Sequence, residues 1–222
     1  MSSSVLKIKN LSKSFGTGAE KLHILTGVDL ELNAGEVLAI QGPSGCGKST
    51  LISVIAGLDV FDTGEVEILD TSPKKLSSAE WNSFRAKNIG IIFQQFHLLE
   101  HLTALENIRL PLDLAAHPQA DKLAVEALER VGLKDRRDHF QRELSRGESQ
   151  RVAIARVLVM KPKLILADEP TASLDMKTGK EISQMIFGLA REENIAALVV
   201  THDPSIADLC DRTFNMRNGK LI

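Results

Sequence analysis

The sequence predicts an α/β fold with a mostly parallel sheet, an antiparallel β portion near the N-terminus and an inserted helical lobe. Nearly continuous apolar runs are typical of parallel strands buried on both faces, and there are four: Val37–Ile40, Ile89–Phe93, Leu164–Ala167 and Ala196–Val200. Three segments instead alternate between apolar and polar residues, as half-buried antiparallel strands do: Leu6–Lys9, Val28–Leu32 and Glu65–Leu69. Between Gln95 and Glu143 the strand signal disappears, which indicates helices.

Helical segments are expected between the apolar runs, for example Lys48–Ala56 and Lys177–Glu193. Within the region that lacks strands, Asp121–Val131 carries its apolar residues on one helical face, and Gly132 is suited to end that helix. The segment Phe214–Ile222 reads as a hairpin that turns at Asn-Gly. Without internal repeats, the chain is expected to form one domain over residues 1–222, with a core at about 1–94 and 150–222 and a helical lobe at about 95–149.

Composition excludes several classes of protein. Apolar residues make up 43% and charged residues 25%, which is an ordinary globular balance, and the net charge of −2 argues against nucleic-acid binding. Cys46 and Cys210 lie far apart with no metal-ligand spacing, which favours a reduced, cytosolic setting. The longest apolar runs resemble Ile195–Val200, whereas a membrane span needs roughly 20 apolar residues. Met1–Val5 lacks signal-peptide features, so any membrane span is expected to come from another chain.

A phosphate-binding loop is the most specific motif. The segment Gly42–Ser49 fits the pattern G-x-x-x-x-G-K-[ST], directly after an apolar run and before a predicted helix. Glycines allow backbone N–H groups to wrap phosphates, and the following helix directs its positive end at them. Lys48 is expected to reach the β- and γ-phosphates, and the Ser49 hydroxyl to ligate Mg²⁺. The alternative, a glycine-rich turn without ligand, does not account for the agreement between motif and context.

Two adjacent carboxylates follow the apolar run Leu164–Ala167. Asp168 is expected to hold Mg²⁺, and Glu169 to accept a proton from the attacking water or to orient it. An Asp-Glu-Pro turn at the surface is the alternative for this segment taken alone. The presence of a phosphate loop in the same chain favours the catalytic interpretation.

A family resemblance appears in Leu144–Glu148, which reads Leu-Ser-Arg-Gly-Glu and resembles the Leu-Ser-Gly-Gly-Gln signature of ATP-binding cassette (ABC) ATPases. Further matches in the family's order are the Q-loop glutamine Gln94, the D-loop Ser173-Leu174-Asp175, the switch histidine His202, and Phe15, where a ring usually stacks on adenine. The resemblance covers the whole chain and implies a P-loop NTPase core with the ABC ATPase fold. Within Gln94–Pro111 the chain looks most like the branch of lipoprotein-release, macrolide-export and antimicrobial-peptide-resistance ATPases, with the related cell-division ATPases.

The resemblance implies a set of site residues for ATP and Mg²⁺. Glu169 and His202 would be catalytic, and Ser49, Gln94 and Asp168 would hold the metal. The expected nucleotide-binding residues are Phe15, Gly42, Pro43, Ser44, Gly45, Cys46, Gly47, Lys48, Ser49 and Thr50. The signature residues Ser145, Arg146, Gly147 and Glu148 would contact the ATP held by the opposite subunit of a homodimer, with Asp175 in the D-loop.

Several of these residues have structural alternatives. Ser145 and Glu148 form a helix capping box, a role compatible with binding an anion. His202 and Gln94 have alternatives as ordinary residues at strand ends, and Phe15 as a core residue. Arg146 departs from the family's glycine, and two interpretations are open: it reaches the opposite triphosphate, or it remains in water, which we favour.

The function implied is that of an ATPase subunit, peripheral on the inner face of the cell membrane, that drives a separate transmembrane permease. The alternatives are a soluble ABC ATPase that acts on DNA or ribosomes, and a regulatory module that binds ATP but barely hydrolyses it. A P-loop kinase would have no use for the signature or for His202. In such a complex the partner would determine the transported substrate.

Overall fold

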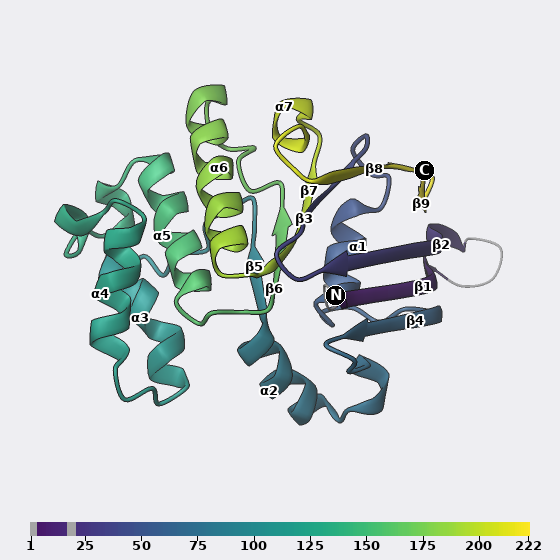
Figure 1. Cartoon of the computed structure of the whole chain (residues 1–222), viewed down its shortest axis with the longest axis horizontal. Coiled ribbons are helices and arrows are strands. Elements are labelled where there is room, and N and C mark those ends of the chain that lie inside the picture. The colour runs from purple at the N-terminus through teal and green to yellow at the C-terminus, as the bar shows by residue number, and fades with distance from the viewer. Residues whose placement is uncertain (1–3, 17–20) are drawn as a thin grey trace.

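The computed structural model of the chain describes residues 4–16 and 21–222, and its strands form two sheets (Figure 1). Met1, Ser2 and Ser3 of the N-terminal segment considered above lie outside the described residues. The first sheet is antiparallel with the order β2-β1-β4, which span Leu22–Asn33, Ser4–Phe15 and Thr63–Ile68. The second has the order β5-β6-β7-β3-β8-β9, which span Ile89–Ile92, Leu164–Asp168, Ala196–Thr201, Val37–Gln41, Arg212–Arg217 and Lys220–Leu221.

The six-stranded sheet is parallel from β5 to β8, and β9 runs antiparallel to β8. Alternate residues along its strands belong to two different apolar clusters, one on each face of the sheet. Leu164 and Leu166 of β6 pack with α1 (Lys48–Ile55), whereas Ile165 and Ala167 pack with α6 (Met176–Glu192). Both faces are therefore buried, which explains the continuous apolar runs. The predicted α/β class with an antiparallel N-terminal portion is confirmed.

A helical lobe lies at the end of the molecule opposite the three-stranded sheet (Figure 1). Its helices α3 (Ala104–Leu114), α4 (Ala120–Arg130) and α5 (Arg146–Leu158) enclose a third apolar cluster. Helix α5 is shared: Val152 and Ala155 face the lobe, while Ile154 packs with the residues beneath the large sheet. The helix that follows the signature segment thus connects the lobe to the core.

Some strand and helix boundaries differ by a residue or two from those expected from the sequence. The alternating segment expected to end at Leu69 ends at Ile68, because Leu69 and Asp70 have left-handed backbone angles, φ +51° and +57°. Helix α4 is followed by Gly132 at φ +74°, and the hairpin β8–β9 turns through Asn218 and Gly219 at φ +48° and +73°, as predicted. The expectations did not include α2 (Ser78–Asn88), α7 (Pro204–Ala207) and the short 3-10 turns at Pro73–Lys75, Lys134–Arg136 and Gln141–Glu143.

Within the described ranges, no helix combines the length and the apolar character needed to cross a lipid bilayer.

Candidate active site at the carboxyl edge of the parallel sheet

The loop 42–47 joins the central strand β3 to helix α1, and two of its glycines are required by their surroundings. A Cβ on Gly42 would lie 2.5 Å from the carbonyl oxygen of Met216 in β8. Gly47 has φ +111°, and a Cβ there would lie 2.8 Å from the carbonyl oxygen of Ile24 in β2. The loop is therefore held tightly between β8 and β2, with its backbone at the first turn of α1.

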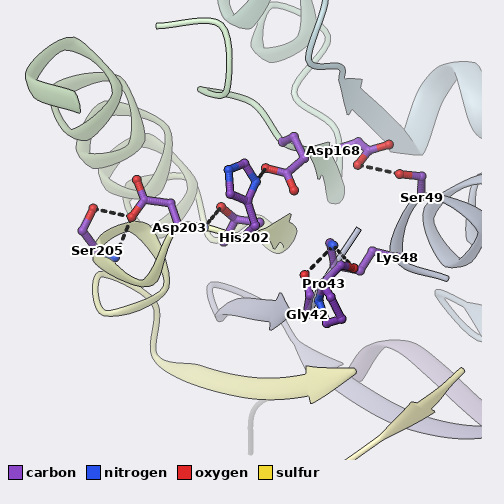
Figure 2. Close-up of polar contacts among 10 residues, drawn as sticks. Gly42, Pro43, Lys48, Ser49, Asp168, His202, Asp203 and Ser205 are labelled. Carbon is purple, nitrogen blue, oxygen red and sulfur yellow. Dashed lines mark hydrogen bonds and ion pairs between the residues drawn. The ribbon is translucent and has the colours of Figure 1, made fainter. Parts of the chain in front are cut away.

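Lys48 is the first residue of α1, and its side chain is buried. Its ammonium donates hydrogen bonds to the carbonyl oxygens of Gly42 at 2.7 Å and Pro43 at 3.1 Å (Figure 2). These two carbonyls hold the Lys48 ammonium across the loop, beside the N-terminus of α1. The ammonium and the helix N-terminus both attract an anion to the same place.

A cleft of about 670 Å³ opens in front of this loop. Most of the predicted nucleotide and catalytic residues of the chain line it, and Ile24 and Ala172, which were not predicted, do so as well. The lining residues are Ile24, Ser44, Gly45, Gly47, Lys48, Ser49, Thr50, Gln94, Glu169, Ala172 and His202. Cys46 is half-buried in the same loop. The structure thus brings together residues from the ends of β3, β5, β6 and β7.

Asp168 ends β6, beside the start of α1. Its Oδ1 accepts a hydrogen bond from the Ser49 hydroxyl at 3.1 Å (Figure 2). Burial raises the pKa of Asp168 above its ordinary value, and the Ser49 hydrogen bond partly offsets this. A hydroxyl and a carboxylate oxygen at this separation suit a hard cation such as Mg²⁺.

Glu169 and His202 meet because β6 and β7 are neighbours in the sheet. Asp168 pairs with Val200, so both strands end at the same level. His202 Nδ1 lies 2.8 Å from Glu169 Oε2, and only 16% of the Glu169 side chain is exposed. The structure therefore forms a carboxylate–imidazole pair at the cleft.

The backbone of Glu169 is left-handed, at φ +48°. This conformation costs a non-glycine residue about 1–3 kcal/mol. It is fixed on both sides, since the Glu169 N–H donates to Val200 O at 3.0 Å and its carbonyl accepts from Ala172 N–H at 3.2 Å. These two hydrogen bonds hold the backbone of a residue that lines the cleft.

The signature segment lies outside this cleft and begins α5. Ser145 Oγ accepts from the Glu148 N–H at 3.2 Å, and Glu148 Oε2 accepts from the Ser145 N–H at 2.8 Å, so the predicted capping box is confirmed. Arg136 Nε donates to Glu148 Oε1 at 2.7 Å, and this bond, with that from the Ser145 backbone, lowers the pKa of Glu148 to about 2. The N-terminus of α5 is thus capped by its own first turn and tied to Arg136.

Arg146 is exposed, but it is not simply solvated. Its Nη1 donates to the carbonyl oxygen of Ser173 at 3.3 Å, a contact that was not predicted. Gly147 lies close to α6, since a Cβ there would come within 3.0 Å of Thr178 Cγ2. Asp175 caps α6 by accepting from the Thr178 N–H at 3.0 Å. The signature and D-loop residues therefore contact each other within one chain.

Phe15 ends β1 and pairs with Leu22 of β2, two residues before Ile24, which lines the cleft. Its side chain is 46% exposed. Phe15 therefore lies two strand positions from a residue that lines the cleft, and nearly half of its surface is accessible to a ligand.

Comparison with known proteins agrees with this arrangement. Residues 25–172 match the family model described as ABC transporter. The lipoprotein-releasing system ATP-binding protein LolD 1 of Rhodopirellula baltica is 43% identical over 220 residues, covering 98% of this chain and 96% of that protein. The uncharacterized ABC transporter ATP-binding protein YbbA of Escherichia coli K12 is 42% identical, with 98% and 96% covered.

A solved structure, the dimeric post-hydrolysis state of the ATP-binding cassette MJ0796 bound to ADP and Pi, superimposes with a TM-score of 0.87 at 39% identity. It covers 97% of this chain and 96% of that one. Family model, relatives and fold agree with the motifs quoted from the sequence, including the lipoprotein-release branch. The chain therefore belongs to the ABC transporter family, as an ATP-binding, ATP-hydrolysing subunit.

Proposed function

We propose that the chain binds ATP with Mg²⁺ in the cleft at the carboxyl edge of the six-stranded sheet and hydrolyses it to do conformational work on a membrane partner. The observation that carries this proposal is the convergence on one cleft of the phosphate loop and the Glu169–His202 pair. An anion-binding loop supplies the site for the triphosphate, and the pair supplies the chemistry.

Phosphate binding is assigned to the loop 42–47 and to Lys48, Ser49 and Thr50. Lys48 would exchange its carbonyl partners for phosphate oxygens, which are stronger acceptors because they are charged. Ser49, Asp168 and Gln94 would hold Mg²⁺, and Ser49 and Asp168 already lie 3.1 Å apart. When bound, the ion would neutralise charge on the phosphates. Phe15 would stack on the adenine.

Glu169 is the proposed general base. It would take a proton from the water that attacks the γ-phosphate, while His202, 2.8 Å away, fixes the orientation of the carboxylate. The left-handed backbone of Glu169 supports this role, because strained residues held by their surroundings concentrate at active sites.

The signature residues support a homodimer. Ser145, Arg146, Gly147 and Glu148 form an anion-suited helix N-terminus that does not line the cleft of its own chain. Two chains arranged head to tail would bring each such terminus to the other chain's ATP, with Asp175 at the junction. The dimeric relative bound to ADP and Pi supports this arrangement.

The membrane partner is proposed as a separate permease, with the chain on the cytoplasmic, inner face of the membrane. The output would be export, lipoprotein release or mechanical signalling; the LolD relatives favour lipoprotein release. Residues of about 95–149 would form the lobe that transmits closure of the dimer. A soluble or regulatory ABC ATPase remains the alternative.

A steady-state ATPase assay of the purified chain, with Mg²⁺ and with a chelator, tests the proposal. Turnover that depends on Mg²⁺ is expected, and its absence would favour the regulatory alternative. Co-purification from membranes tests the coupling: a chain recovered without any membrane protein would favour the soluble alternative.

A further inference from the structure

Lys13 is a buried lysine in β1 that the proposed mechanism does not use. Its side chain is 5% exposed, and its Nζ lies 2.9 Å from Asp59 Oδ1. The same Nζ lies 4.6 Å from the centre of the Phe15 ring, over its face. A buried charge is costly unless it is paired, and this ammonium is stabilised by one carboxylate and by the face of one aromatic ring.

The ion pair between Lys13 and Asp59 lies next to α1, the helix that follows the phosphate loop. Asp59 follows the end of α1 by four residues, and its backbone N–H donates to Ser53 O of that helix at 3.3 Å. The Asp59 carboxylate is fixed further by the Val60 N–H, at 2.7 Å. Lys13 therefore connects the Phe15 ring to the segment that directly follows α1.

Much of Phe15 is accessible. The residue keeps 46% of its surface exposed although the ammonium covers one face of the ring, so a ligand would stack on the opposite face. Its partner Leu22 is two residues from Ile24, which lines the cleft. A flat ligand that stacks on the opposite face would thus have its phosphates within reach of the loop.

We infer that Lys13 is a positioning residue of the nucleotide site, which holds the Phe15 ring for stacking of the purine base on its opposite face. The inference rests on the proposed nucleotide site. Aromatic faces carry negative charge and repel one another when stacked. A cation held on the far face draws that charge away, which strengthens stacking on the near face. The Asp59 anchor also fixes the distance from the ring to the phosphate loop.

Binding of ADP and of pyrophosphate, measured by calorimetry, separates the base from the phosphates without turnover. Lys13→Met keeps the aliphatic stem and removes the charge. We expect it to weaken ADP binding roughly three- to tenfold and to leave pyrophosphate binding unchanged. Lys21→Met is the matched control, because Lys21 also pairs with an aspartate, Asp62, at 3.7 Å. It should change neither affinity.

Phe15→Leu, alone and combined with Lys13→Met, completes the cycle. The effect of Lys13→Met on ADP should vanish in the Phe15→Leu background. The inference is overturned if the lysine variant binds ADP within about twofold of wild type, if it weakens both ligands equally, or if its effect persists without the ring. If Phe15→Leu alone leaves ADP binding unchanged, the adenine platform itself is wrong, a separate failure.

Lys13→Met leaves Asp59 without its partner, so its stability must be checked by thermal unfolding. If it does not fold, Asp59→Asn and the double variant Lys13→Met/Asp59→Asn replace it. Asp59→Asn releases the anchor and should give a smaller loss of ADP binding, again without effect on pyrophosphate. Unchanged ADP binding in both replacement variants overturns the inference.

Discussion

Replacement of Glu169 by glutamine removes a proton acceptor and almost nothing else. The side chain keeps its volume, and its amide oxygen still accepts from His202, 2.8 Å away in the wild type. Glutamine has the same backbone strain at φ +48°, so the fold should be unaffected. Loss of a general base lowers turnover roughly 10²–10⁴-fold, which corresponds to about 2.7–5.4 kcal/mol of activation free energy.

The assay is Mg²⁺-dependent ATPase turnover, with nucleotide binding and size-exclusion chromatography in parallel. Glu169→Gln should bind ATP as tightly as wild type, because the phosphate contacts come from the loop 42–47. It should also accumulate as an ATP-bound dimer, since reopening requires hydrolysis. Glu36→Gln is the matched control: Glu36 is a similarly shielded carboxylate paired with Arg212, outside the cleft. Near-wild-type turnover in Glu169→Gln, or an equal loss in Glu36→Gln, would refute the assigned role.

Three further predictions concern the lobe and the signature. Leu99 is 38% exposed beside the Q-loop, whereas Leu98 is only 7% exposed. An exposed apolar side chain can anchor a helix of a partner, so Leu99→Glu should reduce co-purification with the membrane partner at unchanged basal ATPase activity, and full co-purification would show that the partner binds elsewhere. Leu98→Glu should instead lower the melting temperature. Arg146→Gly should change the free energy of unfolding by less than about 1 kcal/mol. In a Glu169→Gln background it should also leave ATP-driven dimerisation intact. A salt-sensitive loss of dimer would instead show that Arg146 contacts the ATP bound by the other subunit. Glu148→Gln should cost at most about 1 kcal/mol at neutral pH. Because the Glu148 pKa is lowered from 4.5 to about 2, the carboxylate's contribution is complete above pH 4.5 and should disappear as the pH falls toward 2. The difference in urea stability between wild type and Glu148→Gln should shrink over this range, and a difference at pH 2 as large as at neutral pH would contradict this account.

The parallel strands could be predicted because burial on both faces leaves a local mark, a run of apolar residues such as Leu164–Ala167. Helix α2 left no such mark, since Trp81 is its only buried residue. Its capping box, Ser77 with Glu80, was a usable signal at the N-terminus.

Site residues were predictable where a motif is contiguous, as at Gly42–Ser49. Contacts between distant segments were not. Arg146 meets Ser173 across 27 residues and Lys13 meets Asp59 across 46. Neither spacing follows from a periodic pattern, because both depend on how loops are brought together by the sheet.

The position of β3 between β7 and β8 determines when the nucleotide site can form during synthesis of the chain. The ribosome produces β3 and the phosphate loop early, but their flanking strands, Ala196–Thr201 and Arg212–Arg217, come much later. The loop also packs against Met216 through Gly42. Until those strands arrive, a nascent chain has the motif without the frame that shapes it. ATP affinity should therefore be acquired abruptly and late in synthesis, rather than growing with chain length.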